Sequence, residues 1–409
     1  MTIITVATVG FQEVHPLSDA GRLFTSFLII TSFGTFAYAI TSLSQYVLNG
    51  EFQLYFKNYR VNTVIQKLEN HIIICGYGRN GKQAAQVLKN KKQKMKILVN
   101  DGIEPIGKQL LEAAGFEVDM NKIDQADLIN KLPDYDAICV RSATKVRQEL
   151  MDACPNLKAI GRGGVGLDNI DVEYAKSKGI AVINTPAASS RSVGELAMAH
   201  MLGLSRFLHL ANRQMPETGN TQFNELKKAY SKGAELEGKT LGIIGLGRIG
   251  METAKCGLGM GMNIVAYDPF VSEVTLNIGP KTLGFQTTIK TVNLDDLLIA
   301  ADYVSLHIPS VGKAILGKEE FAKMKTGVFV INCSRGGTID EDALLDALNS
   351  GKVAAAGLDV FDNEPTPRMD ILSHPRISLT PHIGASTEEA QNKIGEELAQ
   401  KMIAALSNQ

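Results

Sequence analysis

The segment from Leu241 to Asp268 constrains the fold more than any other stretch of the chain. It reads as an apolar strand, a glycine-rich turn, a helix and a second apolar strand that ends in an acid. Gly245, Gly247 and Gly250 form the pattern G-x-G-x-x-G directly after the first apolar run. In this context the glycines allow a tight turn, and the helix N-terminus offers free N–H groups to a pyrophosphate. The segment therefore predicts a doubly wound α/β sheet with a dinucleotide site at the turn.

The acid at the end of this segment bears on which dinucleotide fits. Asp268 follows the apolar residues Asn263 to Tyr267. At the end of a strand its carboxylate can accept hydrogen bonds from the two hydroxyls of a ribose, whereas a 2′-phosphate there would meet like charge. The residues therefore favour NAD over NADP.

Length, charge and cysteine content narrow the class of protein. With 409 residues the chain is long enough for two or three domains. Its net charge of −1 argues against nucleic acid as a partner, because no excess of cations is present to contact phosphates. The cysteines are odd in number and form no C-x-x-C pair, which indicates reduced thiols in a cytosolic compartment and no metal site. They are Cys75, Cys139, Cys154, Cys256 and Cys333.

The first 94 residues differ in character from the rest. The stretch from Leu23 to Gly50 has no formal charge and is long enough to span a bilayer as a helix. Lys57, Arg60 and Lys67 follow it, so the positive-inside rule places the remainder of the chain in the cytoplasm. We therefore expect membrane association through residues 23–48. The alternative is a helix buried in a protein core.

A short motif precedes this apolar stretch. Thr5 to Phe11 resembles the selectivity filter of potassium channels, and His71 to Leu88 resembles the start of the regulatory nucleotide-binding domain attached to such channels. Gln12 stands where the second filter glycine is expected, and most of the pore is missing. We interpret residues 1–50 as a truncated channel pore loop and transmembrane helix, vestigial or fused, and residues 51–94 as a linker with an incomplete nucleotide-binding unit. The alternative is a membrane-tethered nucleotide sensor that gates ions.

A second glycine pattern lies in this region. Gly76, Gly78 and Gly81 also form G-x-G-x-x-G, and Asp101 follows at a suitable distance. However, the apolar residues Met95 to Val99 are needed as the opening strand of the next unit, and one strand cannot easily serve both. We therefore predict no cofactor at this second turn.

From Met95 onward, apolar strands alternate with helices, which predicts parallel strands covered by helices. The fold class expected is α/β, with two Rossmann-like or flavodoxin-like domains built on doubly wound parallel sheets, preceded by one transmembrane helix. We place a substrate-binding domain at 95–195 plus 386–409 and an NAD-binding domain at 196–385. A long helix from Ser192 to Leu210 should connect the two, and a cleft between domains is where a substrate is expected.

Chemically useful side chains follow three of the predicted strands. Carboxyl ends of parallel strands are where open α/β sheets bind their ligands. Arg335 can clamp a carboxylate with its planar guanidinium, and His382 can exchange a hydroxyl proton near neutral pH. Glu364 can orient the imidazole and favour its charged form. The alternatives are a surface ion pair for Arg335, a turn residue for Glu364 and a capping or core histidine for His382.

Residues 95–409 are similar to the D-isomer-specific 2-hydroxyacid dehydrogenases. The segments that carry this resemblance are Val140 to Val146, Gly161 to Asp171, Gly245 to Gly250, Asn332 to Gly337 and His382 to Ser386. The resemblance implies that His382 and Glu364 form the proton relay and that Arg335 binds substrate. It implies nucleotide contacts at Gly245, Gly247, Arg248, Ile249, Gly250, Asp268, Cys333, Asp359 and Gly384. Substrate contacts are expected at Arg141, Ser142, Arg162 and Gly164.

The resemblance is strongest to the family members that oxidise 3-phospho-D-glycerate to 3-phosphohydroxypyruvate with NAD, the first step of serine synthesis. It implies a phosphorylated 2-hydroxy acid as substrate and a homodimer or higher homo-oligomer. The chain ends without an amino-acid-binding ACT domain, so we expect no feedback inhibition by serine. The alternative is another 2-hydroxyacid dehydrogenase, such as a glyoxylate or hydroxypyruvate reductase.

Overall fold

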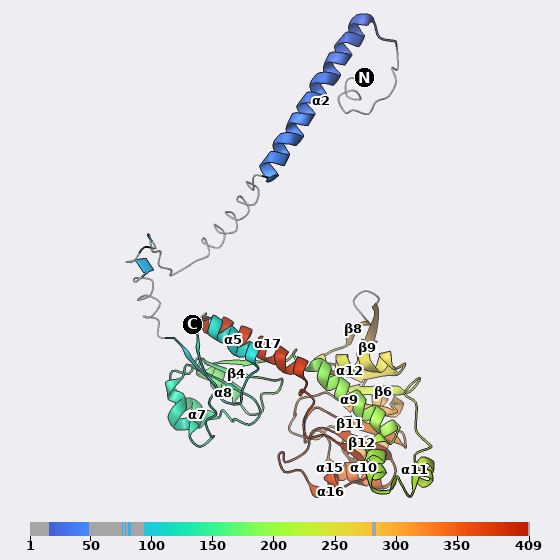
Figure 1. Cartoon of the computed structure of the whole chain (residues 1–409). Helices are drawn as coiled ribbons and strands as arrows, with labels where there is room; N and C mark the ends of the chain where they lie inside the picture. The colour runs from blue at the N-terminus through green and yellow to red at the C-terminus, as the bar shows by residue number, and fades with distance from the viewer. Residues whose placement is uncertain are drawn as a thin grey trace. The chain divides into compact units, whose positions relative to one another are not determined.

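The computed structural model describes residues 16–48, 76, 78, 81–82, 94–279 and 284–407. The chain divides into two compact units, Met1–Lys92 and Gln93–Gln409, and each is considered by itself (Figure 1). The predicted filter motif and most of the incomplete nucleotide-binding unit lie outside the described residues.

The first unit contains one long helix, α2 (Asp19–Leu48). Its segment Asp19–Ser42 is long and apolar enough to cross a membrane, and none of that segment's most apolar window is buried. Hydroxyl groups on the helix donate to its own backbone: Thr31 bonds the carbonyl of Phe27 at 2.9 Å, and Thr41 that of Ala37 at 2.7 Å. These bonds satisfy the hydroxyls without water, as an apolar surrounding requires.

The second unit begins with a parallel sheet of described strands in the order β2-β1-β3-β4-β5. Side chains of β1 alternate between two cores: Leu98 packs on one face of the sheet, and Ile97 and Val99 on the other. Helices α5 and α17 cover the face of Ile97, where α17 supplies Leu398 and Met402. The strands are β1 (Lys96–Val99), β2 (Glu117–Asp119), β3 (Ala137–Val140), β4 (Ala159–Arg162) and β5 (Ala181–Asn184). The helices are α5 (Pro105–Ala113), α6 (Leu128–Lys131), α7 (Gln148–Asp152), α8 (Val172–Ser177) and α17 (Glu388–Ser407), with the 3-10 helix η1 (Leu132–Asp134).

A second parallel sheet follows, with its described strands in the order β13-β12-β11-β10-β6-β7. Its strand β6 leads directly into the predicted glycine turn, and helix α12 begins at Arg248. The strands are β6 (Thr240–Ile244), β7 (Asn263–Tyr267), β10 (Tyr303–Leu306), β11 (Val328–Asn332), β12 (Val353–Leu358) and β13 (Ile377–Leu379). The helices are α9 (Ser190–Ser205), α10 (Leu208–Thr218), α11 (Phe223–Ala229), α12 (Arg248–Gly259), α13 (Leu294–Ala300), α14 (Lys318–Lys323), α15 (Glu341–Asn349) and α16 (Met369–Leu372). Two parallel sheets covered by helices confirm the predicted α/β class.

Two helices that accompany the second sheet begin at residues whose side chains cap them. The side chain of Asn293 accepts a hydrogen bond from the backbone N–H of Asp296 at 2.9 Å, which caps α13. Asp340 caps α15 in the same way through Ala343. Each cap satisfies one of the N–H groups that a helix start leaves without a backbone partner.

One local prediction is wrong, and one pair of strands was not predicted. The helix expected from Ser192 to Leu210 is wrong as one piece, because Phe207 adopts a left-handed conformation (φ 56°) that ends α9 and lets α10 begin. An antiparallel hairpin of β8 (Glu273–Ile278) and β9 (Phe285–Lys290) was not anticipated. Its signal is a two-residue alternation in which Leu276 and Ile278 are buried and their neighbours are not.

Candidate active site

A cavity of about 1090 Å³ lies in the second unit, lined by residues that follow strands of both parallel sheets. Arg141 and Arg162 come from the ends of β3 and β4 in the first sheet. Arg335 and His382 follow β11 and β13 in the second. Both sheets therefore present their carboxyl ends to one space, as the rule for open α/β sheets predicts.

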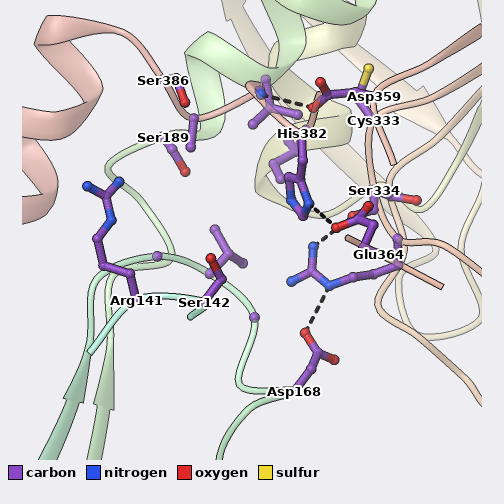
Figure 2. Close-up of a pocket in the computed structure, with 18 of the residues that line it drawn as sticks. Arg141, Ser142, Asp168, Ser189, Cys333, Ser334, Asp359, Glu364, His382 and Ser386 are labelled. Atoms are coloured by element: carbon purple, nitrogen blue, oxygen red, sulfur yellow. Dashed lines mark hydrogen bonds and ion pairs between the residues drawn. The ribbon is translucent and has the colours of Figure 1, made fainter. Parts of the chain in front are cut away.

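His382 and Glu364 form a hydrogen-bonded pair at this cavity. The Nδ1 atom of His382 lies 2.8 Å from Oε2 of Glu364, and the two side chains point toward one another in Figure 2. The hydrogen bond to Glu364 raises the pKa of His382 above its ordinary value, against the opposing effect of burial. Burial alone would raise the pKa of Glu364, but hydrogen bonds from His382 and from the N–H of Phe361 lower it. The pair is therefore an anionic carboxylate that holds an imidazole, and among the described residues no hydrogen bond to Nε2 is found.

His382 sits in an unusual backbone conformation. Its φ is 54°, in the left-handed region that costs a non-glycine residue roughly 1–2 kcal/mol. Histidine visits this region more often than most residues, but the surrounding loop must still hold it there. Asp359 does much of this: it is 1% exposed, and its carboxylate accepts hydrogen bonds from the N–H groups of Ile383 (2.8 Å) and Gly384 (2.9 Å).

Arg335 is held from the side of the first sheet. Its Nε donates to Oδ2 of Asp168 at 3.0 Å, and its Nη1 donates to the carbonyl of Ser334 at 2.7 Å. A side chain at Gly166 would collide with Nη2 of the same guanidinium. The arginine predicted to bind substrate is thus oriented by a loop that follows β4.

Two further arginines face the same space. Arg141 and Arg162 both line the cavity, and no ion pair of either is found among the described residues. The Nε of Arg162 is buried and has no hydrogen-bond partner in the part of the chain that the structure describes. Burial, together with the positive charges of Arg335 and Arg141, lowers the pKa of Arg162 to about 10. Three cations with few protein counter-charges make this part of the cavity a site for an anion.

The glycine turn is closely packed at two of its glycines and open at the third. Gly245 has φ 95°, and a Cβ there would lie 2.5 Å from the carbonyl oxygen of His307. A Cβ at Gly250 would collide with the carbonyl of Gly245, whereas one at Gly247 would meet no atom within 4 Å. No side chain caps the start of α12, so its first N–H groups stay available.

Comparison with known proteins places the chain in a family. Residues 198–384 match the family described as D-isomer specific 2-hydroxyacid dehydrogenase, NAD binding domain. A hydroxypyruvate reductase of Thermotoga maritima is 45% identical over 313 residues, which cover 75% of this chain and 97% of that protein. The chain belongs to the D-isomer-specific 2-hydroxyacid dehydrogenase family. It is an NAD-dependent oxidoreductase, as the resemblance implied.

Other similar proteins share this dehydrogenase unit. A D-3-phosphoglycerate dehydrogenase of Archaeoglobus fulgidus is 42% identical over 313 residues, covering 76% of this chain but only 57% of that protein. A crystal structure of a glyoxylate reductase from Paecilomyes thermophila superposes with a TM-score of 0.66 at 31% identity, covering 77% of this chain and 96% of that one. D-lactate dehydrogenase from Aquifex aeolicus, complexed with NAD and lactic acid, gives 0.61 at 29% identity, covering 76% and 96%. Residues 1–49 match an ion channel family.

The dehydrogenase gathers most of the predicted site residues at the cavity. All of the predicted catalytic and substrate residues line it, and so do the nucleotide residues Arg248, Ile249, Cys333, Asp359 and Gly384. Gly245, Gly247, Gly250 and Asp268 do not line it and form the turn beside it. There the carboxylate of Asp268 accepts the N–H of Leu246 at 2.8 Å, so it is tied to the glycine turn. The turn, the uncapped helix and this acid fit an NAD molecule.

Three residues at or beside the cavity were not predicted to act there. Asp168 accepts a hydrogen bond from Arg335, although only its place in a family motif could have drawn attention to it. Asp101, the acid of the second glycine pattern, accepts hydrogen bonds from the N–H groups of Arg141 (2.7 Å) and Thr144 (3.0 Å). It therefore holds the backbone of the loop that carries Arg141. His307 lines the cavity with a pKa lowered to about 3 by burial, and is a neutral imidazole.

Proposed function

We propose that this dehydrogenase oxidises 3-phospho-D-glycerate to 3-phosphohydroxypyruvate with NAD. The observation that carries the proposal is the set of three arginines at one cavity, two of them without a described ion pair. A phosphate group carries about 1.5 to 2 negative charges at neutral pH, and the acid adds a carboxylate. Arg335 can bind the carboxylate, which leaves Arg141 and Arg162 for the phosphate.

The chain's own residues account for the proton chemistry. Because Nδ1 of His382 is bonded to Glu364, its Nε2 faces the substrate and can accept the proton of the C2 hydroxyl. Glu364 stabilises the imidazolium that forms, and Arg335 orients the carboxylate beside the carbonyl that develops at C2. Bound NAD supplies the acceptor for the hydride from C2. In the reverse direction the imidazolium returns the proton to the carbonyl oxygen.

A second candidate substrate is unphosphorylated hydroxypyruvate. It is favoured by the hydroxypyruvate reductase of Thermotoga maritima, because this chain covers 97% of that relative's length. The two functions use the same relay and differ in whether the arginines at β3 and β4 read a phosphate.

The distinguishing experiment is Arg141→Ala, with Lys145→Ala as a matched control. Lys145 is an exposed cation of the same loop that does not line the cavity. We expect wild-type protein to prefer 3-phosphoglycerate over D-glycerate in kcat/KM. Arg141→Ala should lower kcat/KM for the phosphorylated acid roughly 10- to 100-fold, the effect of one charge-assisted hydrogen bond, and change that for D-glycerate little. Equal losses of kcat/KM for both acids would reject the phosphorylated substrate. A wild-type preference for hydroxypyruvate over 3-phosphohydroxypyruvate in the reverse reaction would reject it as well.

We further propose that α2 anchors the dehydrogenase in a membrane with the catalytic part on the cytoplasmic side. The support is that α2 has no charged residue from Leu23 onward and exposes large apolar side chains: Phe24, Phe27 and Phe33 are each more than 60% exposed. A charge at the centre of such a helix costs about 2.5–3.5 kcal/mol on insertion. Ile30→Arg should therefore shift the protein from the membrane to the supernatant of lysed cells, whereas Ile30→Leu should not. Carbonate extraction that releases the wild-type protein would contradict the anchor.

A homodimer is also proposed. Exposed apolar side chains lie on α10 and at the start of α11, where Leu208, Met215 and Phe223 are 63%, 44% and 58% exposed. Helix α10 has no buried residue, which suits a helix covered by a second copy. Light scattering in detergent should give a dimer mass for the wild type and a monomer for Leu208→Glu. A wild-type monomer would refute the proposal.

A further inference from the structure

A buried histidine outside the catalytic pair is connected by hydrogen bonds to the loop that carries His382. His200 lies on α9, is 3% exposed, and is not among the residues that line the cavity. Its Nδ1 lies 3.0 Å from Oγ of Ser378, and its Nε2 lies 3.0 Å from Oγ1 of Thr380. The imidazole thereby bridges two residues at the end of β13, the strand that leads to His382.

The hydrogen bonds determine which nitrogen of His200 carries the proton. The hydroxyl of Thr380 donates to the carboxylate of Asp359 at 2.6 Å, so its single hydrogen is already used. Its oxygen must therefore accept from Nε2–H of His200. The unprotonated Nδ1 then accepts from Ser378. Burial lowers the pKa of His200, in agreement with a neutral imidazole.

The network continues to the loop that carries the catalytic histidine. The same carboxylate of Asp359 that accepts from Thr380 also accepts from the N–H groups of Ile383 and Gly384, the residues directly after His382. Figure 2 shows Asp359 beside His382 at the wall of the cavity. Hydrogen bonds thus run from His200 on α9 through Thr380 to Asp359, and the carboxylate of Asp359 also accepts from the two residues after His382.

The sheet makes room for this imidazole at one glycine. A Cβ at Gly357 on β12 would lie 2.7 Å from Cβ of His200 and 2.9 Å from its Cγ. The strand that needs support is β13, which has only three residues and lies at the edge of the sheet. Few backbone hydrogen bonds hold such a strand, while His382, three residues past its end, is kept in a left-handed conformation.

We propose that His200 is a positioning residue that, through Thr380 and Asp359, holds the loop of His382 in its catalytic conformation. This inference rests on the proposed function only in that it assigns His382 the proton relay. His200 touches neither the cavity nor the relay, so it acts through its neighbours. Loss of the network should let the loop relax and misalign His382 with Glu364.

The test compares His200→Leu and Thr380→Val with the conservative variant Thr380→Ser in the full chain. Thr380→Val removes the hydroxyl at nearly constant shape, and Thr380→Ser restores it. We expect His200→Leu and Thr380→Val each to lower kcat roughly tenfold, with KM changed less than twofold, and Thr380→Ser to stay near wild type. The double variant should match the single variants, because the two residues act as one unit.

A second readout does not depend on turnover. The imidazole of His382 is titrated by NMR in protein without cofactor, with His382→Gln to assign its signal. Misalignment with Glu364 should move this titration to lower pH in His200→Leu and Thr380→Val, and Thr380→Ser should leave it unchanged. If kcat and the titration both stay at wild-type values while only the melting temperature falls, His200 merely fills the core and the proposal is overturned. If the wild type oxidises no 2-hydroxy acid, the proposed function fails, but the titration still decides the role of His200. Should His200→Leu not fold, the two Thr380 variants decide alone.

Discussion

The glycine turn offers a pair of substitutions whose effects the structure separates. Gly245→Ala places a side chain at φ 95°, which costs roughly 1–2 kcal/mol for an L-residue. The new Cβ would also lie 2.5 Å from the backbone oxygen of His307, which cannot move without shifting β10, and such overpacking costs about 1–3 kcal/mol. The free energy of unfolding of the dehydrogenase unit should therefore fall by roughly 2–5 kcal/mol, a large part of a typical domain's stability.

Gly247→Ala should behave in the opposite way. Gly247 has an ordinary φ of −74°, and its Cβ would meet no atom within 4 Å. The lost backbone freedom of the unfolded chain stabilises by about 0.4–1 kcal/mol, and alanine as a poorer N-cap destabilises by a similar amount. The free energy of unfolding of Gly247→Ala should therefore differ from that of the wild type by less than about 1 kcal/mol. The added methyl occupies space into which a pyrophosphate must approach, so NADH affinity should fall tenfold or more.

Urea unfolding and NADH fluorescence titration measure the two effects on the same preparations. The expected pattern is an unstable Gly245→Ala and a stable Gly247→Ala with weak NADH binding. A Gly247→Ala protein that binds NADH like the wild type would refute the reasoning. So would one that is destabilised as much as Gly245→Ala.

Three further predictions concern the relay, the substrate arginine and the core. Glu364→Gln removes the charge that raises the pKa of His382. Because oxidation needs the neutral imidazole and reduction the charged one, the rise of the oxidation rate with pH and the fall of the reduction rate with pH should both move to lower pH. Rate profiles that do not move would exclude the pairing of His382 with Glu364. Asp168→Ala should lower kcat/KM roughly fivefold to tenfold, because it frees Arg335 and because the exposure of the Asp168 side chain limits the loss. Asp168→Asn keeps a hydrogen-bond acceptor and should retain most activity. Steady-state kinetics that show equal losses for the two variants would count against the role of Asp168 in orienting Arg335. Leu298 is fully buried, and Leu298→Ala should lower the free energy of unfolding in urea by about 2–5 kcal/mol. Its neighbour Ile299 is 59% exposed, and Ile299→Ala should lower it by less than about 1 kcal/mol. Similar values for the two variants would contradict the assigned burial.

Local sequence signals predicted much of the architecture. The turn at Gly245 was found because a tight turn, close approach to phosphate and helix packing all demand glycine at fixed spacing. Strand positions in both sheets followed from short apolar runs, because strands buried on both faces carry few polar residues. The sequence does not predict the hairpin of β8 and β9, because its alternating pattern is weak. It does not predict the break at Phe207, because no glycine or proline marks that position.

The sequence by itself determined the fold class, the NAD turn and the identity of the side chains that follow each strand, because these depend on residues close together in the chain. Only the tertiary structure decided which of those side chains meet. The pairing of Arg335 with Asp168 and the connection of His200 to the loop of His382 join residues 167 and about 180 positions apart. Their contacts depend on how the two sheets and α9 pack, since hydrogen bonds require distances that no sequence spacing specifies. The glycine at position 357 shows the same dependence: its need is set by an imidazole from another element and not by its own strand.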